Sequence, residues 1–246
     1  ENKLIDYYES NPDSIAPKTR FNEVLSFIKS GLKDLSISRT TFKWGVPVPN
    51  NSKHVMYVWI DALCNYLTSI GYPDLNHSKY KKFWPGTHIV GKDILRFHAV
   101  YWPAFLMAAE LSPPKKIFAH GWWTNEGQKI SKSLGNVIDP YKIINEYGLD
   151  QIRFFLFREV PFGNDGDFSK NAISKRINAD LSNNYGNLIQ RIASFIIKNT
   201  NGEVSKPNEI KEKDNKLLQE FNVTLKDYLN SMEIFQIDKA LKNIFE

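Results

Sequence analysis

Apolar side chains in the first 35 residues recur at three- and four-residue spacing, as at Val24 and Ile28. That spacing places them on one face of a helix. Pro12 and Pro17 interrupt the pattern, because proline cannot continue a helix interior. The sequence therefore predicts short helices here.

Three short apolar runs follow, at His54–Ile60, Thr87–Val90 and Lys116–His120. Each is predicted to be a strand, and the first to be buried, because it is continuous and rich in β-branched and aromatic residues. The segments between these runs have helical spacing of apolar residues. The first is predicted to be a helix capped by Asp61, and the second a helix over Ile94–Glu110. Strands that alternate with helices indicate an α/β fold with a parallel sheet.

Proline and glycine suggest the remaining local structure. Leu35–Ser38 alternates and could be a strand, whereas the two prolines of Val46–Asn51 predict a loop. Trp122–Gln128 resembles a hairpin. A short helix is expected from Asp139-Pro140 to Gly148, and Asp150 is predicted to cap the next one.

Beyond Ser169 the strand signals end and helical stripes take over, which predicts an all-α bundle. Asn201–Pro207 is predicted to be a linker between two of its helices. The stripes comprise Ile173, Ile177, Leu181, Tyr185, Leu188, Ile192 and Phe195, then Leu218, Phe221, Leu225, Tyr228 and Leu229, then Ile237, Ala240, Leu241 and Ile244.

Composition narrows the class of protein. With 246 residues and 42% hydrophobic side chains, the chain can bury one substantial core and a smaller second one. A net charge of +5 suits a polyanionic partner, although many basic proteins bind none. The longest apolar run, Ala99–Ala109, is too short to span a bilayer, so no membrane partner is expected.

The single cysteine, Cys64, excludes an internal disulfide and a multi-cysteine zinc site. We therefore expect no zinc site in this segment and a reducing compartment, either the cytoplasm or an organellar matrix. Cys64 lies in an apolar stretch and is predicted to be a small buried side chain.

The sharpest chemical motif is Lys129-Ile130-Ser131-Lys132-Ser133, followed by Leu134-Gly135-Asn136. Two lysines in a mobile, serine-containing loop can hold a polyphosphate. Ammonium groups that meet the charge developing on a departing pyrophosphate lower the barrier to its displacement. Taken alone, the motif is equally compatible with a phosphate-binding loop and with a solvated basic turn.

This loop resembles the second signature of class I aminoacyl-tRNA synthetases, with Ile130 where the family usually has methionine. Tyr57–Tyr66, Gly91–His98 and Phe118–Trp122 resemble blocks of the methionyl members. The blocks occur in the family's order and approximate spacing, and the resemblance covers nearly the whole chain. It is therefore far more specific than any one block.

The resemblance implies a fold and an activity. The fold would be α/β, the second half of a Rossmann-like parallel sheet followed by an all-α anticodon-binding bundle. The activity would be that of a methionine–tRNA ligase, which makes methionyl-adenylate from methionine and ATP with Mg²⁺ and transfers methionine to tRNA(Met), including the initiator. The segments would be the end of a connective region (1–53), the half-sheet (54–119), the lysine loop with a stem-contact segment (120–168) and a partial bundle (169–246).

The resemblance also implies roles for residues. Lys129 and Lys132 would be catalytic. A methionine pocket needs aromatic walls and a weak polar contact for a soft thioether, although a single aromatic or histidine is more often part of a core. The pocket would comprise Trp59, Ala62, Leu63, Tyr66, Ile94, His98 and Trp102. ATP would meet Gly91, Asp93, His120, Gly121, Trp123, Ser131 and Ser133.

Asn184–Arg191 resembles the family's anticodon-recognition helix. Asn187 and Arg191 are four residues apart, so both project from one helical face. Planar amide and guanidinium groups can hydrogen-bond to unpaired bases. Without the resemblance, a solvated polar face would be the preferred interpretation.

Two features of the family are missing from the sequence: its first, His-containing ATP signature, and the strand whose carboxylate binds the amino group of methionine. The fragment alone is therefore expected to be inactive. One alternative is a synthetase for leucine, isoleucine, valine or cysteine. Another is a non-catalytic tRNA-binding fragment or paralogue.

Overall fold

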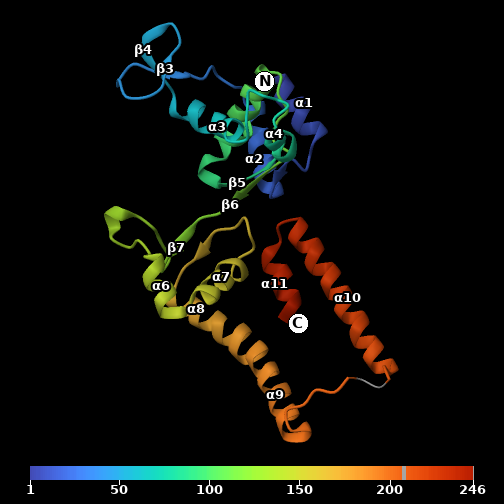
Figure 1. Ribbon diagram of the computed structural model, residues 1–246. Coiled ribbons are helices and arrows are strands. Elements are labelled where there is room, and N and C mark those ends of the chain that lie inside the picture. Colours follow the sequence, from blue (N-terminus) through green and yellow to red (C-terminus); the bar gives the residue numbers. More distant parts are fainter. Residues whose placement is uncertain (207–208, 246) are drawn as a thin grey trace. The chain divides into compact units, whose positions relative to one another are not determined.

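The computed structural model describes residues 1–206 and 209–245. The chain divides into two compact units, Glu1–His120 and Gly121–Glu246. Within the described residues, the first unit contains two sheets and the second contains one, and each unit has its own apolar core. Figure 1 follows the chain through both units.

The first unit contains the predicted parallel sheet, with strand order β1-β6-β5. β5 (Thr87–Gly91) and β6 (Lys116–His120) pair in parallel from Thr87↔Lys116 to Gly91↔His120. These two predicted strands are confirmed. The third strand, however, is β1 (Ile15–Ala16), which pairs in parallel with the other edge of β6.

The predicted buried strand His54–Ile60 is confirmed only for His54–Met56, and not as part of the parallel sheet. β4 (Asn51–Met56) belongs to a separate antiparallel sheet with β2 (Ser38–Arg39) and β3 (Pro47–Val48). In β4 only Val55 is buried. The chain then enters α3 (Val58–Thr68), because packing of Leu63 and Leu67 overrides the strand preference of the aromatic and β-branched residues at its start.

Three neighbouring predictions need correction. Asp61 does not cap this helix, because α3 begins three residues earlier, after Tyr57. Ser38 is the only residue of the predicted strand Leu35–Ser38 that lies in β2. Pro47 lies in a strand rather than in a loop, which its position at the edge of the sheet allows.

Helices surround the parallel sheet. α1 (Asn2–Ser10) and α2 (Lys18–Lys29) confirm the predicted helices, and α4 (Ser78–Phe83) precedes β5. The predicted helix Ile94–Glu110 is a 3-10 turn η1 (Lys92–Ile94), a π-helical turn η2 (Phe97–Tyr101) and α5 (Trp102–Ala108). One core cluster joins α1 and α2 to β5 and β6, and a second joins α3 to α5.

The second unit begins with the predicted hairpin. β7 (Trp123–Asn125) pairs with β8 (Gln128–Lys129), and β9 (Gly166–Asp167) joins β7 in parallel. A 3-10 turn η3 (Lys132–Leu134) follows the hairpin. α6 (Pro140–Tyr147) is confirmed with its cap, since Asp139 accepts from the N–H groups of Tyr141 and Lys142.

The prediction that Asp150 caps the next helix is wrong by two residues. Gly148 is the N-cap of α7 (Leu149–Arg158), and Asp150 lies in its first turn. A carboxylate there still stabilises the helix through its dipole.

The region beyond Ser169 is helical, as predicted, and comprises α8 (Lys170–Arg176), the π-helical η4 (Ile177–Gly186), α9 (Asn187–Thr200), α10 (Glu212–Glu233) and α11 (Ile237–Phe245). α10 packs against α11, and α11 packs against α7 (Figure 1). Within the described residues the stripes on α9 and α10 are largely exposed, so they do not form a closed bundle. Pro207 of the predicted linker and Glu246 of the predicted bundle lie outside the described residues.

Candidate functional site

Gly91, Asp93 and His120 come together at the carboxyl ends of β5 and β6. Gly91 and His120 are paired in the sheet. A Cβ on Gly91 would lie 2.6 Å from Oδ1 of Asp93 and 3.8 Å from Cε1 of His120. A larger residue at position 91 would therefore displace the Asp93 carboxylate from this position. In open parallel sheets, ligands bind outside these strand ends.

Tyr66 on α3 and His98 on η2 are joined by a hydrogen bond of 2.9 Å between the hydroxyl and Nε2. Nδ1 of His98 lies 3.0 Å from the carbonyl oxygen of Ile94. A carbonyl can only accept, so Nδ1 carries the proton, and in the neutral ring Nε2 accepts from Tyr66. Burial lowers the pKa of His98, and the bond to the Ile94 carbonyl raises it less. Burial also raises the pKa of Tyr66, so the phenol remains a donor.

Aromatic rings enclose this polar pair. Trp59 stacks on Phe97 with ring centroids 3.9 Å apart and planes within 9°, and it meets His98 edge-on at 6.0 Å. The π-helical turn η2 carries both Phe97 and His98. Such turns often mark functional sites. Phe97 was not among the predicted pocket residues, although it lies inside the block that carried the resemblance.

The other predicted pocket residues fall into two groups. Leu63 and Trp102 are completely buried and share the core cluster between α3 and α5. Ala62 is exposed and Ile94 half-buried. Tyr66 lies 6.4 Å from Trp102, centroid to centroid. Five of the seven predicted pocket residues therefore lie together where α3 meets η2 and α5: Trp59, Leu63, Tyr66, His98 and Trp102. Ala62 also lies on α3, and Ile94 lies beside His98.

His88 is a buried polar residue that the sequence analysis missed. Only 7% of it is exposed, and its ring meets that of Tyr66 at 4.3 Å. Within the described residues, its Nε2 has no hydrogen-bond partner. Burial lowers the pKa of His88 from 6.5 to about 4, and the neighbouring His98 adds to this effect. A neutral imidazole therefore packs against the ring of Tyr66.

This burial predicts acid sensitivity. Above about pH 6.5, His88 is neutral in both the folded and the unfolded protein, so its burial does not lower the free energy of unfolding. As the pH falls toward 4, only the unfolded chain gains the proton, so up to roughly 3 kcal/mol of unfolding free energy is lost.

Urea unfolding of the full-length protein at a series of pH values measures this loss. His88→Phe, which keeps a flat apolar ring, should flatten the profile between pH 6.5 and 4. If the two profiles had the same slope, the assignment of His88 as a buried neutral group would be wrong.

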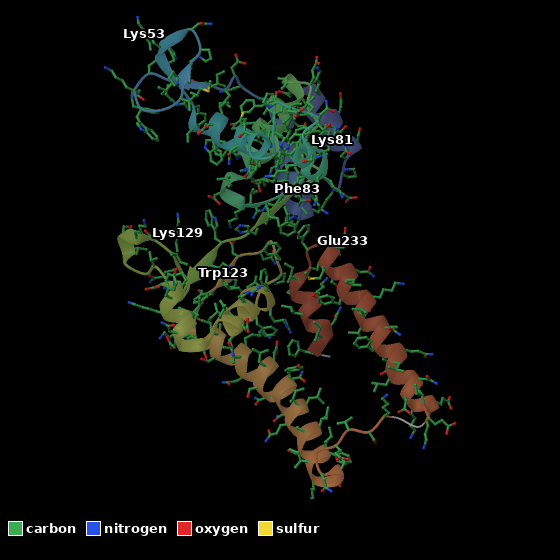
Figure 2. The ribbon with its side chains drawn as sticks, in the orientation of Figure 1. Lys53, Lys81, Phe83, Trp123, Lys129 and Glu233 are labelled. Carbon is green, nitrogen blue, oxygen red and sulfur yellow. The ribbon has the colours of Figure 1, made fainter. Side chains whose placement is uncertain are left out.

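The lysine loop follows the hairpin β7–β8. Lys129 is the last residue of β8, with Nζ 5.5 Å from the ring centroid of Trp122, and Lys132 begins η3. Figure 2 labels Trp123 and Lys129 on the two strands of this hairpin. Both lysines are exposed, and within residues 1–206 and 209–245 neither forms a salt bridge. The hydroxyls of Ser131 and Ser133 are 2.7 Å apart.

Asp167 is a second residue that the sequence analysis missed. Its Oδ1 accepts from the hydroxyl of Thr124 at 2.6 Å and from the N–H of Gly127 at 2.7 Å. The bond from Thr124, followed by that from Gly127, lowers the pKa of this carboxyl. Asp167 thereby holds the turn of the hairpin that carries Lys129.

Two of the predicted ATP residues have clear packing roles. A Cβ on Gly121 would collide with the backbone of Asn164 and Asp165. Trp123 is half-buried and packs with Phe155 and Phe168, at centroid distances of 5.7 and 6.3 Å. Their contact with ATP stays a prediction.

Asn187 and Arg191 lie on α9, both exposed, with Asn187 as its first residue. The side-chain amide of Asn187 donates to the carbonyl of Asn183 at 2.9 Å. This bond holds the amide near the backbone and leaves its oxygen able to accept. The predicted pair therefore occurs on one exposed helix, one turn apart.

The described residues contain no group of three or more His, Cys, Asp or Glu side chains that could hold a metal ion. They also contain no helix long and apolar enough to cross a membrane. Cys64 is exposed, contrary to the prediction that it is buried.

Comparisons with known proteins agree on one family. The family model described as "tRNA synthetases class I (M)" matches residues 1–193. The methionine–tRNA ligases of Rickettsia bellii and Mesorhizobium japonicum are 58% and 56% identical over 99% and 100% of this chain. The chain spans about half the length of these curated relatives, 48% of each.

A solved structure supports the same relationship. The methionyl-tRNA synthetase of Mycobacterium tuberculosis in complex with methionyl-adenylate superposes with a TM-score of 0.93 and 51% identity. The alignment covers 99% of this chain and 48% of that one.

Proposed function

Because this chain belongs to the class I (M) tRNA synthetase family, we propose that it supplies the methionine pocket and the ATP loop of a methionine–tRNA ligase. The full-length protein would form methionyl-adenylate from methionine and ATP, release pyrophosphate and transfer the methionyl group to tRNA(Met). The observation that carries the proposal is the Tyr66–His98 pair among aromatic rings.

The pocket suits a thioether for a physical reason. Sulfur in methionine is polarizable and a weak acceptor, and it packs well against aromatic rings. The stacked pair of Trp59 and Phe97 provides a flat aromatic surface, while the neutral tautomer of His98 aligns the Tyr66 hydroxyl. A neutral pocket avoids desolvating a charge beside an apolar ligand. We assign Trp59, Ala62, Leu63, Tyr66, Ile94, His98 and Trp102 to methionine.

We assign two groups of residues to ATP. Gly91, Asp93 and His120 lie at the strand ends, where a carboxylate can accept from a ribose hydroxyl. Gly121, Trp123, Ser131 and Ser133 complete the assignment, and Lys129 and Lys132 bind the phosphates. ATP enters as its magnesium complex, with the ion held through the phosphates.

The helical region serves tRNA. Asn187 and Arg191 on α9 present hydrogen-bonding groups that suit unpaired bases of the anticodon. We propose that residues 1–53 end a connective region, 54–119 form half of the catalytic sheet, 120–168 carry the lysine loop and a stem contact, and 169–246 begin the anticodon-binding domain. Elongator and initiator tRNA(Met) would both be substrates, in the cytoplasm or an organellar matrix.

Replacing Arg191 by alanine in the full-length protein should weaken discrimination at the anticodon by roughly 1–3 kcal/mol, if it contacts one base with two hydrogen bonds. The measurement is kcat/KM for initiator tRNA(Met) and for an anticodon variant. Lys198→Ala is the matched control, because it removes the same charge from an exposed position on α9. Equal effects of both substitutions would indicate a general charge effect rather than base recognition.

The proposed function is tested by charging. The full-length protein should attach radiolabelled methionine to tRNA(Met) in an ATP-dependent reaction. Binding of tRNA without charging would favour a non-catalytic tRNA-binding protein, and the proposal would then fail.

A further inference from the structure

A side chain to which the family resemblance gives no role, Asn136, closes the base of the lysine loop. Its Oδ1 accepts from the N–H of Ser131 at 2.8 Å, and its Nδ2 donates to the carbonyl of Lys129 at 3.0 Å. In an extended strand, the carbonyl of one residue and the N–H two residues later point to the same side. The amide of Asn136 therefore replaces a neighbouring strand beside Ile130.

Asn136 is itself anchored to the hairpin. Nδ2 of Asn125, the last residue of β7, donates to the backbone carbonyl of Asn136 at 2.7 Å. Gly135, with φ of 67°, makes the turn that brings Asn136 back to the strand. The loop between Lys129 and Asn136 is thus tied at both ends to the small sheet.

The two bonds also define how the amide is oriented. If its oxygen and nitrogen were exchanged, oxygen would face the Lys129 carbonyl and nitrogen would face the Ser131 N–H, and both bonds would be lost. An aspartate cannot replace both bonds, because a carboxylate has no proton to donate to Lys129. The geometry therefore requires an amide.

We propose that Asn136 is a positioning residue for the chemical step of the proposed function, because it sets the separation of Lys129 and Lys132. Both lysines must meet the phosphates of ATP at once. Their side chains are long and flexible, so their reach depends on a well-defined backbone between them. A displacement of about 1 Å at a reacting group can cost on the order of 100-fold in rate.

Asn136→Ala in the full-length protein tests this role. Single-turnover adenylate formation should slow roughly 10- to 100-fold, while the KM for methionine and the melting temperature stay unchanged. Gln128→Ala is the control on the same hairpin. Its side chain is exposed, and within the described part of the chain the structure shows no hydrogen bond to it, so its rate should stay within about twofold.

A double-mutant cycle separates positioning from a general defect. Asn125→Ala should slow the same step, because Asn125 anchors the backbone carbonyl of Asn136. This anchor affects the rate only through the Asn136 side chain that holds Lys129 and Ser131, so the double variant Asn125→Ala/Asn136→Ala should be less impaired than the product of the two single effects. Multiplicative effects would overturn the inference.

Two further results would overturn it. The first is that the unmodified protein forms methionyl-adenylate and Asn136→Ala forms it at the same rate. This result would leave the proposed function intact. The second is a loss of methionine affinity or thermal stability that parallels the loss of rate, which would make Asn136 merely structural. Failure of the unmodified protein to form adenylate would instead reject the proposed function.

Discussion

Replacing Lys132 by alanine in the full-length protein is expected to slow adenylate formation by about 10²–10³-fold. Lys132 is exposed at the start of η3. Pyrophosphate gains negative charge as it leaves, so an ammonium group placed there stabilises the transition state more than bound ATP. Methionine affinity should stay near normal, because Trp59, Tyr66 and His98 lie in other segments.

The measurement is single-turnover adenylate formation, combined with methionine affinity from tryptophan fluorescence. Lys129→Ala should cost less if that lysine only helps to dock the loop, and Ile130→Met should be nearly neutral because the volumes are similar. Lys142→Ala, at an exposed position on α6, controls for the loss of one charge. A wild-type rate for Lys132→Ala would mean that the loop is a solvated basic turn. Loss of methionine binding would make Lys132 structural.

The 246-residue chain by itself is expected to show no methionine-dependent exchange of pyrophosphate into ATP. It spans 48% of the length of its curated relatives, and the family's first ATP signature is not among its residues. Much of a catalytic rate comes from holding the reactants close together in the right orientation. An incomplete site cannot do this, so we expect no measurable rate. Exchange by the purified chain well above the blank would show that the second half of the fold suffices.

Local sequence patterns were sufficient for elements whose own residues carry a clear signal. Thr87–Val90 and Lys116–His120 are short runs with apolar residues at their centres, and both are strands. The cap at Asp139 and the hairpin turn at Gly127 follow from side-chain and backbone preferences that act within four residues.

Two features of the fold could not be predicted in this way. β1 contains only Ile15 and Ala16, and its partner β6 lies about a hundred residues further along the chain, so no local pattern marks it. The run after Met56 is apolar and continuous, and periodicity alone cannot distinguish a buried strand from a buried helix of that length.

The candidate site was predictable only through the family resemblance. Single aromatic residues such as Trp59 are usually core residues, and only their order along the chain singled them out. His88, Phe97 and Asn136 needed the structure, because their roles depend on a ring contact, a stacking geometry and two hydrogen bonds. None of these follows from spacing in the sequence.

The assignment of a methionine pocket to this chain can be tested by ATP–pyrophosphate exchange in the full-length protein, with methionine, leucine, isoleucine, valine and cysteine supplied one at a time. Methionine should support exchange with the highest kcat/KM, and Tyr66→Phe, which removes the hydroxyl bonded to His98, should reduce this preference. A higher kcat/KM for any of the other four amino acids would contradict it.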